Sequence, residues 1–371
     1  MSIIIFIIIL SALIIVHELG HFLVAKKFGI KVEEFGFGFP PRVFGKKIGE
    51  TLYSFNALPI GGFVKLYGED EAGGGRVKRG SQGASSKEPA ADLRRAFFAR
   101  PIYQRSLVVV AGVAMNFILA IILATYLFTF EGIPQNTNNI KVSEVVADSP
   151  ADAAGINKGD LIEKIGEVKI SSTEQLIAET RKHLGETTEI TVRRGDSLEV
   201  ISVTPRKNYP KNQGPMGIAI SQEVIFQKYP FPKSLYYGTK QTLHDSAQVV
   251  IGFKTVILDL VTRFTLSQGI AGPIGMAQLT GEFVRVGPAA VISLVYTLSL
   301  SLAVLNILPI PALDGGRFLF ILVEAVTRRK VNAKFEAYAH MVGIILLLTF
   351  LAVVSYQDII RIISGKSIFP Q

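Results

Sequence analysis

Residues 2–25 read SIIIFIIILSALIIVHELGHFLVA, an apolar stretch with a cluster of ionisable side chains near its C-terminal end. Its length suits the roughly 20 residues that an α-helix needs to cross a bilayer. Lys26 and Lys27 follow the stretch, whereas a signal peptide carries its basic residues in front of the apolar segment. We therefore expect a retained transmembrane helix whose N-terminus lies outside the cytoplasm.

Three further apolar runs, at 106–130, 288–312 and 338–357, are long enough to span a membrane. The 371 residues are 49% hydrophobic and 19% charged, a composition that excludes a wholly soluble or disordered chain. Residues 246–261 are also apolar, but Lys254 and Asp259 would each cost about 2.5–3.5 kcal/mol in lipid. We therefore predict four transmembrane helices, with amphipathic, interfacial helices over 231–287.

The distribution of charge predicts the orientation of these helices. Residues 26–104 carry 14 Lys+Arg against 8 Asp+Glu, and residues 313–337 carry 5 against 3. Residues 131–285 carry 17 against 17. By the positive-inside rule the first two segments are cytoplasmic and the third is external, so both termini lie outside. The net charge of +9 is thus an orientation signal, and we expect no nucleic-acid partner.

The motif VHELGH places His17, Glu18 and His21 near the inner end of the first helix. Imidazoles at positions i and i+4 share one helix face and can bind one Zn²⁺, and Glu18 is placed to accept a proton from water. A shuffled chain of this composition would contain about 0.004 such motifs. Ionisable residues in a membrane span indicate function rather than structure. We predict a zinc site with Glu18 as a catalytic residue.

A third ligand must be a histidine or a carboxylate, because the chain has no cysteine. Asp314 in NILPIPALDGG (306–316) closes the third apolar run, which crosses the membrane in the same direction as the first. Asp314 therefore arrives at the same cytoplasmic side as His17, and we predict it as the third metal ligand. We interpret the other histidines as ordinary surface or boundary residues; they are His183, His244 and His340.

Asn306 lies eight residues before Asp314 in an apolar run. Its amide could bind a substrate carbonyl or the developing oxyanion, which makes it a candidate catalytic residue. An interhelical hydrogen bond explains the same residue equally well.

Together these motifs resemble the site-2 protease family (M50) of intramembrane zinc metalloproteases, most closely the bacterial regulator-of-sigma-E protease group in a single-PDZ form. HELGH in the first helix and NILPIPALDG before the fourth carry the likeness. The supporting segments are EFGFGFPPR (34–42), ALPIGGFVKLYGED (57–70), RRAFFARPIYQR (94–105), AGVAMN (111–116) and GIAGPIGMA (269–277). The second-span motif departs from the family pattern, because Val113 replaces a proline.

The resemblance implies roles for particular residues. His17, His21 and Asp314 match the family's zinc ligands, Glu18 its catalytic glutamate, and Asn306 an asparagine that helps to hold substrate. Residues 57–66 match a membrane-associated β-hairpin or loop that offers an edge strand to an unwound substrate. Such pairing makes physical sense, because a peptide bond in a helix is buried in its own hydrogen bonding.

Residues 131–230 resemble a PDZ domain. Strand-like runs at 140–146, 189–193 and 198–204 flank a helix over 172–183, and GPMGIAI (214–220) could supply the closing strand of a circularly permuted form. A PDZ fold commonly binds a peptide C-terminus. A gating or size-filtering role is equally open here.

The predicted fold is a polytopic α-helical membrane protein with four transmembrane helices, a membrane-associated β-hairpin region and one extracytoplasmic α/β PDZ domain. The membrane core falls into halves at 1–130 and 288–371, with a cytoplasmic hairpin and loop region at 26–104 that includes a flexible linker at 68–92. We expect a bacterial inner-membrane protein with its active site toward the cytoplasm.

The predicted activity is zinc-dependent regulated intramembrane proteolysis of single-pass proteins, such as anti-sigma factors or remnant signal peptides. The partners implied are transmembrane substrates and the lipid bilayer; the sequence does not define an oligomeric state. One alternative is a noncatalytic PDZ-bearing membrane receptor or scaffold, and another is a metal transporter with His17 and His21 as a relay site.

Overall fold

A computed structural model describes residues 1–69, 93–210, 213–263 and 271–364. The chain divides into two compact units. The large unit comprises Met1–Thr129 and Pro230–Gln371, and the small unit comprises Phe130–Tyr229. Most of the linker predicted at 68–92, and the beginning of the 269–277 motif, lie outside the described residues.

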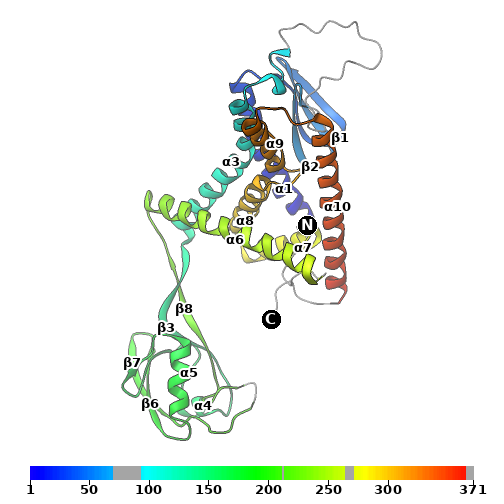
Figure 1. The fold of residues 1–371 in the computed structure, drawn as a ribbon. Helices are drawn as coiled ribbons and strands as arrows, with labels where there is room; N and C mark the ends of the chain where they lie inside the picture. Colours follow the sequence, from blue (N-terminus) through cyan, green and yellow to red (C-terminus); the bar gives the residue numbers. More distant parts are fainter. Residues whose placement is uncertain (70–92, 211–212, 264–270, 365–371) are drawn as a thin grey trace. The chain divides into compact units, whose positions relative to one another are not determined.

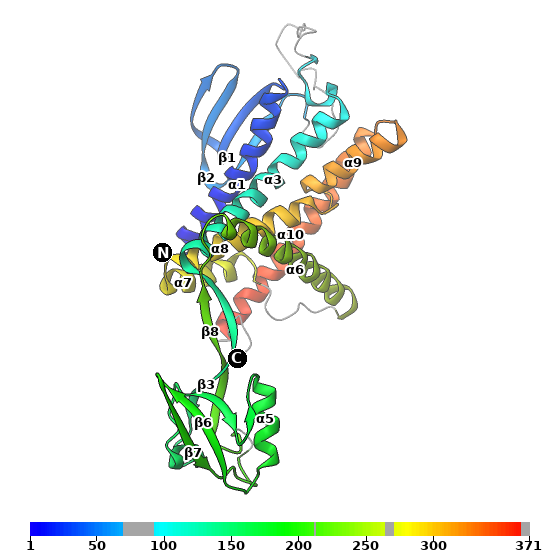
Figure 2. The same cartoon turned by 90° about the vertical axis from the view of Figure 1, so that its left-hand side faces the viewer.

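Four long apolar helices form the framework of the large unit (Figures 1 and 2). They are α1 (Ser2–Lys27), α3 (Ile102–Tyr126), α8 (Pro288–Ile307) and α10 (Ala333–Ile363). Each has the length and composition needed to cross a membrane. Much of their surface is apolar and exposed, as for Leu346 at 64% and Leu348 at 59%, which is the surface that lipid would cover.

Close packing of α1 against α3 depends on a glycine. A Cβ atom added to Gly20 would lie 2.6 Å from the carbonyl carbon of Ala111 and 2.8 Å from Met115 Cγ. A larger residue would therefore push the helices apart, as is general for small residues at membrane helix interfaces. The α3 helix continues without interruption through Val113.

The ends of α8 and α10 differ from the predicted spans. The α8 helix ends at Ile307 and not near residue 312, because Pro309 and Pro311 lack the N–H groups that an α-helix needs. The α10 helix extends beyond the predicted 338–357 at both ends. Between them lies a helix that the sequence did not predict, α9 (Asp314–Thr327). Glu324 on α9 accepts two hydrogen bonds from the guanidinium of Arg105 on α3, at 2.8 and 3.0 Å, and this bidentate ion pair ties the two helices together.

The segment predicted as amphipathic helices contains α6 (Lys233–Arg263) and α7 (Pro273–Val286). Tyr296 on α8 donates a hydrogen bond to Asp245 on α6 at 2.7 Å. Buried Asp358 on α10 accepts a hydrogen bond of 2.7 Å from the backbone N–H of Gly275, in the first turn of α7. These two contacts fix α6 and α7 to the membrane helices.

A long, bent hairpin packs against α1. It consists of β1 (Val32–Ile48) and β2 (Thr51–Leu66). Phe35 on β1 is paired both with Tyr53 and with Val64, so the first part of β1 lies between the two halves of β2. Residues 62–66 consequently form an edge of the sheet. Ser11 on α1 contacts the bend of β2, because its hydroxyl donates to Pro59 O at 2.9 Å.

The bend of this hairpin, around residues 39–44, is apolar and exposed. Phe39, Val43 and Phe44 have exposed fractions of 50%, 68% and 66%. The short 3₁₀ turn Phe97–Ala99 follows in the chain before α3 begins.

The small unit contains one antiparallel sheet in the order β7-β6-β4-β3-β8, with β5 paired to β4. Its strands are β3 (Ile133–Val145), β4 (Leu161–Ile165), β5 (Val168–Lys169), β6 (Thr188–Arg194), β7 (Ser197–Val203) and β8 (Ile218–Gln227). Two helices complete it, α4 (Pro150–Ala154) and α5 (Thr173–Lys182). A π-helical turn, Leu127–Glu131, precedes β3.

The strands and helix predicted in this region are confirmed. A closing strand, β8, pairs with β3, but it begins at Ile218 and continues well beyond the predicted 214–220. Alternating buried residues such as Ile140, Val142 and Ile190 form its core. Asp160, immediately before β4, lies beside Arg194, whose guanidinium donates to Asp160 Oδ2 at 2.7 Å. Burial raises the pKa of Asp160, but the hydrogen bonds from Arg194 and from the N–H of Asn157 outweigh it, so the pKa is lowered.

Candidate metal centre and active site

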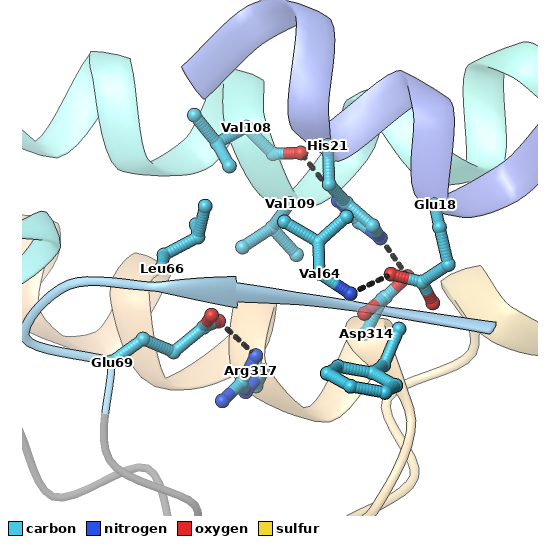
Figure 3. A pocket seen from close by; sticks show the side chains of 10 residues that line it. Glu18, His21, Val64, Leu66, Glu69, Val108, Val109, Asp314 and Arg317 are labelled. Carbon is cyan, nitrogen blue, oxygen red and sulfur yellow. Dashed lines mark hydrogen bonds and ion pairs between the residues drawn. The ribbon is translucent and has the colours of Figure 1, made fainter. Parts of the chain in front are cut away.

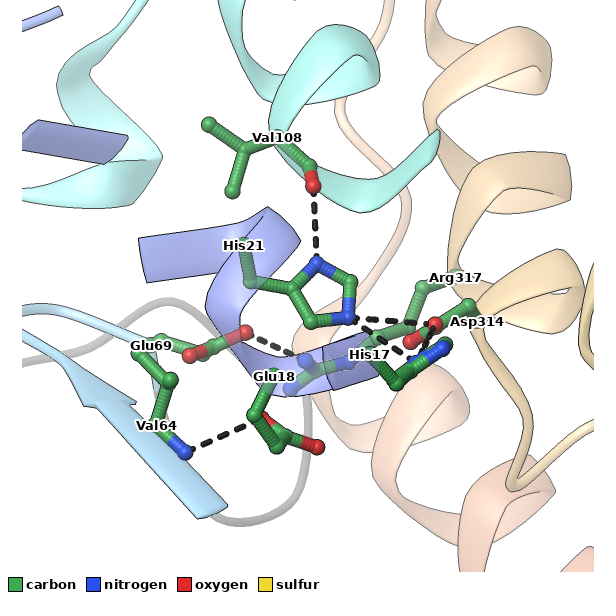
Figure 4. A network of polar contacts seen from close by, with 8 residues as sticks. All are labelled: His17, Glu18, His21, Val64, Glu69, Val108, Asp314 and Arg317. Carbon is green, nitrogen blue, oxygen red and sulfur yellow. Dashed lines mark hydrogen bonds and ion pairs between the residues drawn. The ribbon is translucent and has the colours of Figure 1, made fainter. Parts of the chain in front are cut away.

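Three predicted ligand residues from two distant parts of the chain meet at one point of the large unit (Figure 4). The Nε2 atoms of His17 and His21 lie 3.2 Å apart. Asp314 Oδ2 lies 2.8 Å from the first and 3.2 Å from the second. Within the described residues this is the one group of three His, Asp or Glu side chains close enough to hold a metal ion.

The spacing of these donor atoms suits zinc. Zn–N and Zn–O bonds of about 2.0–2.1 Å in a tetrahedron place neighbouring donors about 3.3 Å apart. The Nδ1–H of His21 donates to the carbonyl of Val108 at 2.8 Å, since that oxygen can only accept. The lone pair of His21 Nε2 is therefore free to bind a metal and faces the other two candidate ligand atoms, His17 Nε2 and Asp314 Oδ2. Nδ1 of His17 is buried and has no partner within the described residues.

Glu18 lies beside this group and contacts the edge of the β-sheet. The backbone N–H of Val64 on β2 donates to Glu18 Oε2 at 3.0 Å. Both residues line a cavity of about 170 Å³ that Figure 3 shows between α1, the end of β2 and α9. The cavity is lined by Glu18, His21, Phe63, Val64, Leu66, Glu69, Val108, Val109, Asp314 and Arg317.

Asp314 reaches the centre because the chain turns sharply before it. Asp314 is the first residue of α9, and two glycines follow it. A Cβ atom on Gly315 would collide with the carbonyls of Ile307 and Leu308, and one on Gly316 would lie 2.9 Å from the carbonyl carbon of Ile310. Only residues without a side chain let α9 begin this close to the end of α8.

Asn306 occupies the last turn of α8, half-buried, and is not among the residues that line the cavity. The two interpretations of its amide, as a substrate contact or an interhelical contact, therefore both remain predictions.

The structure adds a glycine that the sequence analysis did not single out. Gly112 on α3 faces both histidines: a Cβ atom there would lie 2.6 Å from His21 Cε1 and 2.8 Å from His17 Nε2. Gly112 belongs to the AGVAMN segment, but a glycine in an apolar helix does not by itself reveal which side chain approaches it.

An ion pair across the cavity was also not predicted. Arg317, one helical turn beyond Asp314, pairs with Glu69 just after β2. Figures 3 and 4 show the two side chains meeting beside Asp314 and Val64. The pair joins the strand that carries Val64 to the helix that carries Asp314.

Two imidazoles, a carboxylate and a neighbouring glutamate among long apolar helices are the arrangement of a membrane-embedded metallohydrolase. Comparison with known proteins places the chain more narrowly. The sequence profile of Peptidase family M50 matches residues 5–350. The chain belongs to this family, and it is a zinc metalloprotease with zinc as the expected cofactor.

The relatives match along nearly their full length. A candidate zinc metalloprotease of Clostridium perfringens is 34% identical over 350 residues, which cover 94% of this chain and 96% of the relative. The regulator of sigma-W protease RasP of Bacillus subtilis is 28% identical, with 97% and 99% covered. Among solved structures, the PDZ domain of an SdrC-like protein of Listeria monocytogenes is 26% identical, with 24% of this chain and 93% of that one covered and a TM-score of 0.21.

Proposed function

We propose that this protease cleaves peptide bonds within the transmembrane segments of single-pass membrane proteins, with anti-sigma-factor-like proteins and remnant signal peptides as its substrate class. The observation that carries the proposal is the contact of Glu18 with Val64. The Glu18 carboxylate, the edge of the β-sheet and the candidate metal ligands His21 and Asp314 line one cavity, inside a unit built from long apolar helices.

His17, His21 and Asp314 would hold the zinc ion, and His21 is oriented for this by Val108. Bound zinc supplies a Lewis acid that polarises the scissile carbonyl and makes water acidic enough to lose a proton near neutral pH. Glu18 Oε2 accepts the N–H of Val64, which leaves Oε1 to accept the proton of the attacking water. The same carboxyl group then donates this proton to the nitrogen of the departing amine.

The edge formed by residues 62–66 would bind the substrate. One side of this strand pairs with β1, and the other side lines the cavity. An unwound segment that adds to this edge would exchange its helical hydrogen bonds for strand hydrogen bonds beside Glu18. Asn306, in the last turn of α8, would contact the substrate.

The charge distribution supports an inner-membrane protein with both termini outside and the active site toward the cytoplasm. On this orientation the small unit is an extracytoplasmic PDZ domain. It contains an apolar cavity of about 300 Å³ between α5 and β8, lined by residues that include Leu176, Met216 and Ile218. A peptide C-terminus would fit there, and the same domain could gate access by size.

The test is cleavage of a tagged single-pass substrate by the full-length chain in membranes. His17→Ala and Asp314→Ala should each abolish the product, and a zinc chelator should do the same for the wild type. Glu18→Gln should slow cleavage at least about 100-fold. Cleavage at an undiminished rate in Glu18→Gln or without metal would contradict the proposed mechanism.

A noncatalytic PDZ-bearing receptor predicts a different result when the small unit is removed. Its ends are adjacent, because Ile133 on β3 pairs with Gln227 on β8, so a short linker can replace residues 133–227. A protease with its site in the large unit retains cleavage after this deletion. A receptor that acts through the PDZ domain loses its function entirely.

A further inference from the structure

The chain makes a tight turn immediately before Asp314. The N–H of Leu313 donates to the carbonyl of Ile310 at 3.1 Å, which closes a four-residue turn over Pro311 and Ala312. Ala312 has a positive φ of 82°. Proline at the second position and a positive φ at the third define a type II turn, whose third residue is normally glycine or asparagine. An alanine there needs support from outside the turn, because its Cβ disfavours this conformation.

The support comes from α10. The backbone N–H of Ala312 donates to His340 Nδ1 at 2.9 Å, and the His340 side chain is buried. Type I and type II turns differ in the direction of the peptide group between their two central residues. The acceptor on His340 holds the N–H of that group toward α10 and thereby selects the type II form.

A second residue of α10 makes room for the same turn. Gly343 lies one helical turn after His340, on the same side of α10. A Cβ atom at Gly343 would lie 2.9 Å from the Cβ of Pro311. Thus α10 contacts the turn at two positions: His340 supplies a hydrogen-bond acceptor, and Gly343 has no side chain that would collide with Pro311. Much of the remaining surface of α10 is exposed.

The conformation of this turn determines where Asp314 lies. The carbonyl of Leu313 accepts the N–H groups of Gly316 and Arg317 at 3.1 and 3.3 Å, so α9 begins directly at the end of the turn. Asp314 is only two residues beyond Ala312. Metal ligands tolerate displacements of about 0.2 Å, so a flipped peptide group at Ala312 would move the carboxylate out of reach of the histidines.

We infer that His340 is a positioning residue for the metal centre, which acts by holding the Pro311–Ala312 peptide in the orientation that presents Asp314 to His17 and His21. The inference rests on the proposed function, because it takes these three residues as the ligands. It replaces the interpretation of His340 as an ordinary boundary histidine. The sequence could not show this contact, since His340 and Ala312 lie 28 residues apart.

The experiment measures zinc affinity of the purified full-length protein in detergent, by competition with a chromophoric chelator. His340→Leu removes the acceptor and should weaken zinc binding about 10- to 100-fold, as loss of a group that supports a ligand does. His340→Asn retains an acceptor atom at the place of Nδ1 and should bind like the wild type. His340→Gln moves the acceptor one bond further and should behave like His340→Leu. Met341→Leu, on the exposed side of the same turn, is the matched control.

A second substitution separates positioning from simple packing. Glycine adopts a positive φ without strain, so Ala312→Gly should restore zinc affinity to the His340→Leu variant. A packing defect at His340 would not be repaired by a change in the turn. Where His340→Leu does not fold, the contrast between His340→Asn and His340→Gln tests the same point.

Asp314→Ala distinguishes the proposed metal site from the positioning role of His340. If Asp314→Ala binds zinc like the wild type, the proposed metal site is wrong. If Asp314→Ala loses zinc while folded His340→Leu binds it normally, the metal site stands and the role of His340 is refuted. Failure of Ala312→Gly to restore affinity would also refute it.

Discussion

The backbone N–H of Val64 donates a hydrogen bond to Glu18 Oε2 at 3.0 Å. This contact joins the helix that carries the HELGH motif to the free edge of the β1–β2 sheet. Because the two are in contact, a substrate backbone that pairs with the strand edge would lie beside the Glu18 carboxylate that transfers the proton.

Replacement of Glu18 by glutamine should remove proton transfer while preserving the structure. Glutamine has the same shape, and its carbonyl oxygen can still accept the Val64 N–H. We expect cleavage to fall at least about 100-fold, the usual loss for a general base, with zinc content unchanged. Initial rates and metal analysis on one preparation check this. A variant that loses zinc as well would show that Glu18 contributes to the metal site itself.

Gly112→Ala should weaken zinc binding. The new methyl group would lie against the imidazoles of both His17 and His21, and α3 cannot withdraw because it packs closely on Gly20 of α1. Displaced ligands should lower zinc affinity about 10- to 100-fold. Gly252→Ala is the matched control, because a Cβ atom at Gly252 on α6 meets nothing within 4 Å. Equal affinities in the two variants would contradict the close approach of Gly112 to the ligands.

Features that depend on local sequence were predictable. An apolar run long enough to span a bilayer is visible without knowledge of its neighbours, and the four long helices lie at the four predicted runs. His17 and His21 share a face through helix periodicity alone. The meeting of Asp314 with them followed from topology, because equal crossing direction brings both segments to one side of the membrane.

Features that depend on contact between distant residues were not predictable. The ion pair of Glu69 with Arg317 and the approach of Gly112 to His21 join elements with no shared sequence pattern. The bounds and the bend of the hairpin were missed for a similar reason, since the sequence indicated only a hairpin and loop region within 26–104 and a substrate-binding segment at 57–66. Phe35 pairs with both Tyr53 and Val64, and this double pairing arises from a bend that no local period encodes.

The Glu69–Arg317 pair should hold the two walls of the cavity at their working separation. Either single variant, Glu69→Gln or Arg317→Gln, leaves one charge without its partner beside the site and should lower kcat/KM about tenfold. The double variant should be no worse than either single one, with a coupling energy of about 1 kcal/mol or more. A double-mutant cycle with a fluorogenic transmembrane peptide measures this. Arg329→Gln, an exposed arginine near the end of α9, is the control, and additive losses would show that the pair is not coupled.

Acid should weaken the attachment of the hairpin to α1 through Glu50. The hydrogen bond from Arg95 at 2.7 Å, together with Lys26 at 3.1 Å, lowers the pKa of Glu50 to about 2, although partial burial opposes this. A lowered pKa stabilises the folded state above the unfolded value of about 4.3, and this contribution is lost as the pH falls toward 2. Since Glu50 is 31% exposed, solvent reduces the contribution to about 1 kcal/mol.

Glu50→Gln should therefore lower the thermal unfolding midpoint of the full-length protein in detergent at pH 7. The difference from the wild type should shrink as the pH is lowered from 5 toward 2, because the Glu50 carboxylate becomes protonated first in the unfolded state, at about pH 4, and in the folded state only at about pH 2. Glu167→Gln, at an exposed position of the small unit, should leave the midpoint unchanged at every pH. A Glu50→Gln difference that stays constant over this range would show that shape and packing at Glu50, and not its charge, stabilise the hairpin.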